Sequence, residues 1–448
     1  MTKPLRPRPA GSDWLTPLLV FGPLILTTYF AKVGMPVGPR AIPASLYGIL
    51  LLLALGVVSS RLVIDLQRLG AFVLMTAFLG GIMVVRGDEY SITSFLMMAC
   101  LYATYTVSVT DPRYNVKRGI EFFLNVSTII AIGGIAQFFL QFVIGPRLAF
   151  PVDYLLPPGF LVEEYMNLNV LHYGSTVHKP NGIFLLEASF FSQLLAIAVL
   201  AELLTSNRMR YLLLFMTGMV VSYSGTGIIV LVVTMPFLII TQKRWDLILL
   251  ALSGLIAAGL LYNVLNLEIF VERATEFGHP QSSGFMRFVG AYYMFDQFLW
   301  VDQWRSLFGF GAGVFKDFET RTHLPVHESA LTKIVFEFGL IGALLNIGFL
   351  FFCVARSSAP GVLKLGVAVM FFMAGIYTPS SHGIALTIMM WPSPVSEPLR
   401  PVKRSTAVLK WFGLDFNRPS RHVANRRRLA AQARAENARA VTATGKPS

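Results

Sequence analysis

Two histidines lie close together in the segment His323-Leu-Pro-Val-His327-Glu328, directly before a long apolar stretch. Their spacing of four is compatible with metal ligation. However, Pro325 interrupts the helix face between the rings, and no acidic residue has a persuasive spacing as a third ligand. Because the pKa of histidine lies near neutrality, His327 is better suited to accept a proton from a hydroxyl group. We therefore expect neither metal nor cofactor, with His327 as the candidate catalytic residue and Glu328 as the alternative base; a hydrogen bond from His327 to a carbonyl is the competing structural interpretation.

Two arginines precede this segment. Arg273 follows an apolar stretch, and Arg287 opens a run with aromatic and aliphatic residues at helical spacing, namely Phe288, Tyr292, Phe295 and Leu299. An amphipathic helix of this kind suits a membrane interface, where Trp and Tyr are favoured. One interpretation is an aromatic anchor. The other is a platform beneath a lipid-linked ligand, with the guanidinium groups of Arg273 and Arg287 paired with phosphate oxygens.

Acidic residues inside apolar stretches form a second set of candidates, because a charge there is costly and is retained for a reason. They are Glu121, Glu187, Glu202 and Glu337. We expect Glu121 and Glu202 to reach water at helix ends, and Lys333 to pair with Glu337 one turn away. Glu187 closely follows Lys179-Pro-Asn-Gly182 and is the acid that we expect to line an outward cavity.

The elements that must position these residues are apolar. Of the 448 residues, 54% are hydrophobic and 14% are charged, against about 25% charged in a soluble chain, which rules out an ordinary soluble enzyme. A membrane helix needs about 20 mainly apolar residues. We therefore expect an all-α polytopic membrane protein with about 12 transmembrane helices (10–13 would fit, because some stretches are short), near residues 14–33, 42–60, 69–85, 91–110, 119–144, 182–204, 210–224, 226–241, 246–264, 329–355, 362–378 and 383–396.

Loop charges predict the orientation. Basic residues gather in alternate loops, as at Arg61 and Arg68 or Lys243 and Arg244, and the positive-inside rule then places both termini in the cytoplasm. The loops at about 145–181 and 265–328 face outward. We expect residues 1–13 to form a cytoplasmic N-terminus, 14–396 the membrane domain, and 397–448 a disordered tail. That tail holds 12 Lys and Arg against 3 Asp and Glu, a net charge of +9 out of +13 for the chain.

Three glycines recur in Gly309-Phe-Gly-Ala-Gly313. The spacing is compatible with a dinucleotide fingerprint, but no alternation of strands and helices surrounds it. We therefore predict a tight turn that lets backbone segments approach closely.

The order of these features resembles the bacterial polysaccharide polymerase and O-antigen ligase superfamily. Its middle part is similar to Lys179-Pro-Asn-Gly-Ile-Phe-Leu-Leu-Glu187-Ala-Ser189 and to Ser222-Tyr-Ser-Gly-Thr-Gly227, and its second half is similar to a further group of segments. These are Arg287, Gly309–Gly313, His327-Glu-Ser-Ala-Leu331 and Phe338-Gly-Leu-Ile-Gly342. The resemblance covers about residues 179–345. Lys179 stands where the family often has Arg, and Glu328 where it frequently has Asn.

The resemblance implies a metal-independent membrane glycosyltransferase. It would join undecaprenyl-diphosphate-linked repeat units of an exopolysaccharide, capsule or O-antigen at the periplasmic face of the bacterial inner membrane. Arg273 and Arg287, with Lys179 and Glu187, would bind the diphosphate and the substrate, and His327 would activate or orient the acceptor hydroxyl. The implied partners are the lipid-linked oligosaccharide, membrane lipids, and the flippase and chain-length regulator of the same pathway; no nucleic acid is expected.

Three other functions remain open at this point. An O-antigen ligase, which transfers finished glycan to lipid A-core, would share the fold and the chemistry. A flippase or other transporter would predict duplicated halves and ionisable residues throughout the membrane, whereas the cations here concentrate in one outward loop. A membrane scaffold would use the basic tail as its binding part.

Overall fold

The structure is a computed structural model that describes residues 14–37, 40–86, 90–162, 168–171, 175–260, 262, 268, 285–322, 326, 329–373 and 378–394. The chain divides into two compact units, Met1–Arg400 and Pro401–Ser448, and every described residue belongs to the first. The predicted N-terminal segment 1–13 and tail 397–448 lie outside the described residues.

Each of the twelve predicted apolar ranges overlaps an observed helix. The helices are α1 (Leu15–Tyr29), α2 (Ala44–Val58), α3 (Leu66–Arg86), α4 (Ile92–Ala103), α5 (Val116–Ile144), α8 (Ala188–Thr205), α9 (Met209–Val221), α10 (Gly225–Gln242), α11 (Asp246–Leu260), α16 (Ala330–Arg356), α17 (Gly361–Met373) and α18 (Pro379–Ala385). The 3₁₀ turn η1 (Thr104–Thr106) extends α4, and the π-helical turn η6 (Leu386–Met390) extends α18. The last helix begins four residues before its predicted start, because Pro379 suits a first turn.

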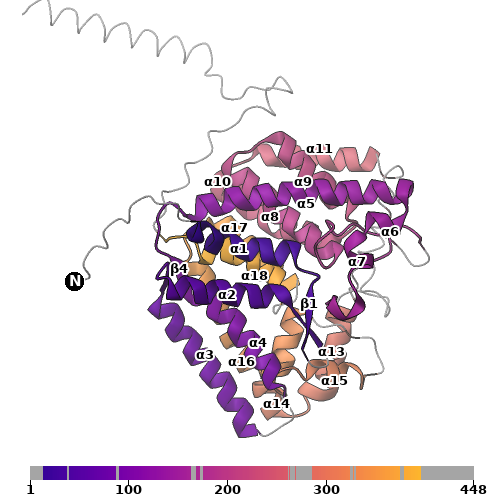
Figure 1. The fold of residues 1–448 in the computed structure, drawn as a ribbon. Helices are drawn as coiled ribbons and strands as arrows, with labels where there is room; N and C mark the ends of the chain where they lie inside the picture. The colour runs from indigo at the N-terminus through magenta and orange to yellow at the C-terminus, as the bar shows by residue number, and fades with distance from the viewer. Residues whose placement is uncertain are drawn as a thin grey trace, which may run out of the picture. The chain divides into compact units, whose positions relative to one another are not determined.

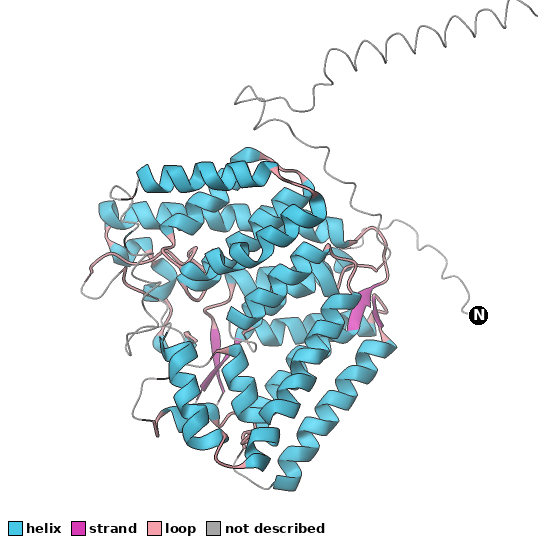
Figure 2. Ribbon diagram, turned by 180° about the vertical axis from the view of Figure 1, so that it is seen from behind, coloured by secondary structure: helices cyan, strands magenta, loops and turns pink. Residues whose placement is uncertain are grey.

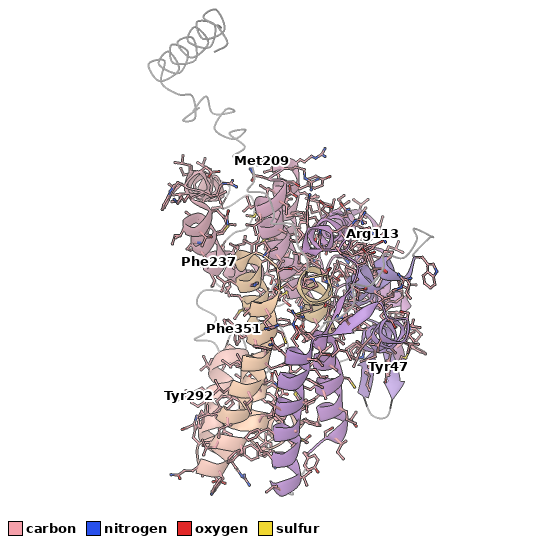
Figure 3. The ribbon with its side chains drawn as sticks, turned by 90° about the vertical axis from the view of Figure 1, so that its left-hand side faces the viewer. Tyr47, Arg113, Met209, Phe237, Tyr292 and Phe351 are labelled. Carbon is pink, nitrogen blue, oxygen red and sulfur yellow. The ribbon has the colours of Figure 1, made fainter. Side chains whose placement is uncertain are left out.

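Five of the described helices are long and apolar enough to cross a membrane: those at Leu66–Val85, Val116–Ile144, Ala188–Thr205, Gly225–Gln242 and Ala330–Arg356. Large apolar side chains stand exposed on several helices, as at Val85 (87%) and Phe351 (68%), the second of which is labelled in Figure 3. The protein is therefore mostly helical and consistent with an all-α membrane protein, while the count of twelve spans stays a prediction.

Helix α8 is the most enclosed of the long helices. Its residues from Phe190 to Leu203 are all buried, and α5, α9, α10 and α17 pack around it. A helix that is apolar on every side is expected at the centre of a bundle. One expectation fails here: Glu202 does not reach water but is fully buried, with Arg208 Nη2 2.8 Å from Glu202 Oε2. Glu121 is exposed, as expected.

Several contacts join loops and helix ends that lie far apart in the sequence. Arg61 Nη1 donates to Thr16 Oγ1 of α1 (3.2 Å), and Arg356 Nη2 at the end of α16 lies 3.6 Å from Asp65 Oδ2. The backbone N–H of Ser91 donates to the carbonyl of Ala312 (2.8 Å). The alternation of the loops between two faces, the membrane itself and the orientation remain predictions.

The two short strand pairs lie at separate places among the helices (Figure 2). Strands β1 (Gly34–Val37) and β2 (Arg40–Pro43) form an antiparallel hairpin between α1 and α2, with Gly34 opposite Pro43. Strands β3 (Leu62–Ile64) and β4 (Val107–Val109) are also antiparallel, with Leu62 opposite Val109. In Figure 1, β4 is at the left edge and β1 is near the middle, so the two pairs are well separated.

The two long loops that are predicted to face outward contain short helices. The first holds α6 (Pro146–Ala149), α7 (Pro151–Leu155) and the 3₁₀ turn η2 (Pro158–Phe160). The second holds η4 (Phe285–Val289), α13 (Gly290–Met294), η5 (Phe295–Leu299), α14 (Gln303–Phe308) and α15 (Phe315–Glu319), where η4 and η5 are π-helical. In Figure 1, α6, α7 and α13 all appear on the right.

Candidate functional site

The structure tests only part of the predicted site. Arg273, His327 and Glu328 lie outside the described residues, and so does His323 of the rejected metal pair. The backbone of Arg287 is described in η4, but its side chain is not. Lys179 and Glu187 are described in full, so the site is built from these two residues and their surroundings.

Lys179 and Glu187 belong to one buried segment that leads into α8; they are 7% and 8% exposed. Glu187 occupies the N-cap position of α8, and the hydroxyl of Ser189 donates to Glu187 Oε2 over 2.8 Å. A carboxylate is favoured at a helix N-terminus, where the backbone N–H groups carry partial positive charge. Glu187 thus lies at the end of α8 opposite Glu202; that it lines an outward cavity stays a prediction.

Helices α8 and α10 begin next to each other. The hydroxyl of Thr226 donates to the carbonyl of Ser189 (3.1 Å), and Ser192 Oγ donates to the carbonyl of Ser224 (3.2 Å). Ser192 Oγ also accepts from the N–H of Gly227 (3.2 Å), where a Cβ atom would meet the backbone carbonyl of Ser192 at 2.4 Å. Glycine is therefore required at position 227, and the two middle motifs of the sequence meet at this point.

The backbone before Gly182 is held by α5. The side-chain amide of Gln137 donates to Asn181 Oδ1 (3.1 Å) and accepts from the N–H of Asn181 (3.0 Å). One turn along α5, Gln141 donates to the carbonyl of His178 (3.0 Å) and accepts from its N–H (2.8 Å). These two glutamines fix the segment around Lys179 to α5.

A buried ion pair joins three segments that are distant in the sequence, namely those around Lys32, Asp153 and Ile183. Lys32 Nζ in the turn after α1 lies 2.6 Å from Asp153 Oδ2 of α7, and these side chains are 1% and 2% exposed. Lys32 Nζ also donates to the carbonyl of Ile183 over 3.0 Å. Burial lowers the pKa of Lys32 to about 8 although Asp153 opposes this shift, and burial raises the pKa of Asp153 although Lys32 opposes it.

The glycine-rich segment Gly309–Gly313 forms the predicted close backbone approach. The N–H groups of Phe310 and Gly311 donate to the carbonyls of Phe336 (3.0 Å) and Glu337 (2.7 Å). The run from Ala330 to Arg356 is broken opposite this segment at Gly339, which has φ 67° and ψ −175°. Two of the four motifs from the second half of the sequence, Gly309–Gly313 and Phe338–Gly342, therefore lie next to each other.

The predicted amphipathic helix after Arg287 is confirmed as a helical run from Phe285 to Leu299. Leu299 is fully buried and Phe295 stacks on Phe336 at 6.2 Å between ring centroids. By contrast, Tyr292 is 62% exposed, and Figure 3 shows it at the edge of the molecule. The exposed tyrosine is compatible with the predicted aromatic anchor.

Several polar residues around the segment 178–187 and in the interior were not predicted from the sequence. Gln137 and Gln141 are spaced by one helical turn in an apolar stretch, which could have indicated a shared polar face. His382 is fully buried and its Nδ1 lies 2.7 Å from the hydroxyl of Tyr105; an ionisable residue in an apolar stretch is itself a signal. The pairing of Lys32 with Asp153 spans 121 residues, and no local pattern encodes it.

The described arrangement combines groups that suit an anion with groups that suit hydroxyls. Lys179 and the N-termini of α8 and α10 supply positive charge and N–H dipoles, and Glu187 supplies a carboxylate beside the hydroxyl of Ser189. Among the described residues no group of three or more His, Cys, Asp or Glu could hold a metal. No protein-family model, curated protein or solved structure matches the chain.

Proposed function

We propose that this protein is a polysaccharide polymerase of the membrane. It transfers a growing glycan from its undecaprenyl diphosphate to the terminal sugar of another lipid-linked repeat unit, at the outer face of a bacterial inner membrane. Arg273, Arg287 and Lys179 bind the diphosphate and stabilise the leaving group as its charge develops. His327 accepts the proton of the acceptor hydroxyl, or Glu328 does so in its place.

One observation carries this proposal: four of the segments that resemble the polymerase and ligase superfamily lie next to each other in two pairs. Glu187-Ala-Ser189 leads into α8, which is bonded to Ser222–Gly227 through Ser192 and Thr226. Gly309–Gly313 is bonded to the backbone of Phe336 and Glu337, immediately before Phe338–Gly342. These contacts bring the segments together in pairs, as a site built from them would require, and in this way they support the proposal.

The decisive experiment is a reconstituted assay. Purified full-length protein in lipid vesicles is supplied with undecaprenyl-diphosphate-linked repeat units in the presence of a chelator. Elongation of the glycan supports the polymerase. Transfer only to added lipid A-core supports the ligase, and movement of the lipid-linked unit across the bilayer without any new glycosidic bond supports a flippase. If the substrate is neither elongated, nor transferred to lipid A-core, nor moved across the bilayer, all three functions are contradicted.

Arg287→Ala should abolish polymer while the protein stays in the membrane, because a lost guanidinium removes a paired contact to phosphate. His327→Ala should reduce synthesis severely. The matched control is Arg321→Ala, which removes an equal charge from the same loop, where the guanidinium of Arg321 lies 4.7 Å from the ring centre of Phe318. Polymer of normal amount and length in Arg287→Ala would remove this residue from the site; electrophoresis of the glycan and membrane immunoblots provide the measurement.

A further inference from the structure

The segment between His178 and Glu187 contains a backbone conformation that its sequence does not favour. Gly182 and Ile183 have φ angles of 68° and 72°. For a β-branched residue such as isoleucine, a positive φ is a genuine outlier. Strained residues of this kind persist only where the surrounding contacts determine the conformation, and they cluster at functional sites.

The first set of contacts comes from α5. Gln137 Oε1 accepts hydrogen bonds from the N–H groups of Asn181 (3.0 Å) and Ile183 (3.3 Å), on either side of Gly182. Its amide nitrogen donates to Asn181 Oδ1 (3.1 Å). The Cβ atom of any other residue at position 182 would meet Ile130 Cγ2 of the same helix at 2.7 Å. One glutamine side chain therefore binds the segment at three points around the strained residues.

The second set comes from the buried ion pair. Lys32 Nζ donates both to Asp153 Oδ2 (2.6 Å) and to the carbonyl of Ile183 (3.0 Å). Asn181 Nδ2 lies 3.4 Å from the same carboxylate oxygen. The ion pair thus contacts the strained segment at both Asn181 and Ile183. A charge pair that is almost fully buried is weak evidence for stability, because desolvation offsets much of its Coulomb energy. Its contacts indicate a role in fixing geometry.

We propose that Lys32, Asp153 and Gln137 are positioning residues for the site at Lys179 and Glu187. Ile183 lies midway between those two, four residues from each, so a rotation of its backbone moves one relative to the other. The three residues clamp this backbone and thereby set the distance between the ammonium and the carboxylate that the lipid-linked donor meets. The identity of that donor rests on the proposed function, whereas the clamp does not.

The test replaces both charges together. Lys32→Met alone would leave a carboxylate buried without its partner and could prevent folding, whereas Lys32→Met with Asp153→Leu removes the charge and keeps apolar volume. Gln137→Met is the second variant, close in shape and free of buried charge. The matched control is Glu202→Leu with Arg208→Met, which removes the ion pair between the buried Glu202 and the partly exposed Arg208 at the opposite end of α8.

Two measurements on the full-length protein in nanodiscs decide the question. Hydrogen–deuterium exchange of peptides covering residues 178–187 should become about tenfold faster in both clamp variants, while their melting temperatures stay close to that of the unchanged protein. With undecaprenyl-diphosphate-linked repeat units, KM for the donor should rise about tenfold and kcat should change much less. The control variant should leave the exchange and KM unaltered.

Unaltered exchange and KM in a folded clamp variant would overturn the proposal, because the ion pair and the glutamine would then be replaceable packing. Faster exchange of residues 178–187 only together with that of the whole protein would also overturn it, since this indicates general destabilisation. If the unchanged protein transfers no glycan, the proposed function fails, and the exchange measurement alone still decides whether the clamp exists.

Discussion

At the scale of single residues, the structure around Lys179 and Glu187 depends on charges that are buried. Lys32 and Asp153 are almost fully buried, and burial is the largest influence on the pKa of each: it lowers that of Lys32 and raises that of Asp153. Both shifts mean that the charged forms lose more by desolvation than their mutual attraction returns. The burial of this ion pair therefore costs free energy, and other contacts of the fold offset this cost.

This cost predicts a dependence of stability on pH. Because the pKa of Lys32 falls from 10.5 to about 8, the folded protein releases this proton at a pH at which the unfolded chain still binds it. The free energy of unfolding therefore increases by roughly 3 kcal/mol at most as the pH rises from about 8 to 10.5. Below pH 8 this additional stability is absent. Thermal unfolding of the unchanged protein and of the double variant Lys32→Met with Asp153→Leu, compared between pH 7.5 and 10, isolates this ion pair. An equal pH dependence of both proteins would contradict the prediction.

Residue types alone indicated part of the site. Glu187 and Lys179 were recognisable because a charge in or beside an apolar stretch needs a reason. The residues that hold the segment between Lys179 and Glu187 could not be recognised in this way. Gln137 and Asp153 lie 44 and 28 residues from their partner Asn181, and contacts at such separations depend on how the helices pack. Arg273, His327 and Glu328 remain predictions because they lie outside the described residues.

At the scale of elements, the largest local departure from expectation is the break in α16. The sequence predicts one uninterrupted span over 329–355, but Gly339 adopts a left-handed conformation that divides the helix. A hydropathy pattern cannot reveal this break, because the residues on both sides of it are mainly apolar, Glu337 excepted. The cause lies in the chain opposite: a Cβ atom on Gly339 would meet backbone atoms of Leu307 and Phe308 at 2.3 Å.

Gly339→Ala should therefore destabilise the protein by roughly 3 kcal/mol, because a side chain there combines backbone strain with a collision against backbone. The control is Gly348→Ala in the same helix, where a Cβ atom would have nothing within 4 Å and where alanine should stabilise by about 0.5–1 kcal/mol. Melting temperatures in detergent give the comparison. If both substitutions shift the melting temperature equally, the close approach at Gly339 is not a structural requirement.

At the scale of the whole molecule, the sequence ranges of the helices could be predicted from composition, whereas the contacts between the helices could not. Every predicted apolar range overlaps a helix, because the hydrophobic effect acts on each stretch separately. Which helix is enclosed could not be predicted in this way: α8 is no more apolar than α10, yet 89% of α8 is buried against 22% of α10.

The division of the chain leads to the last prediction, which concerns the basic tail. The described residues all belong to the unit Met1–Arg400, and residues 401–448 lie outside the described part of the chain. A cluster of basic residues such as Arg426–Arg428 is attracted to anionic lipid headgroups irrespective of any catalysis. Removal of residues 401–448 should therefore leave the melting temperature and polymer synthesis close to those of the full chain. The reconstituted assay, run on both proteins at equal amounts in the membrane, provides the measurement. A truncated protein that stays folded and membrane-bound but makes no polymer would instead assign the tail a direct part in synthesis.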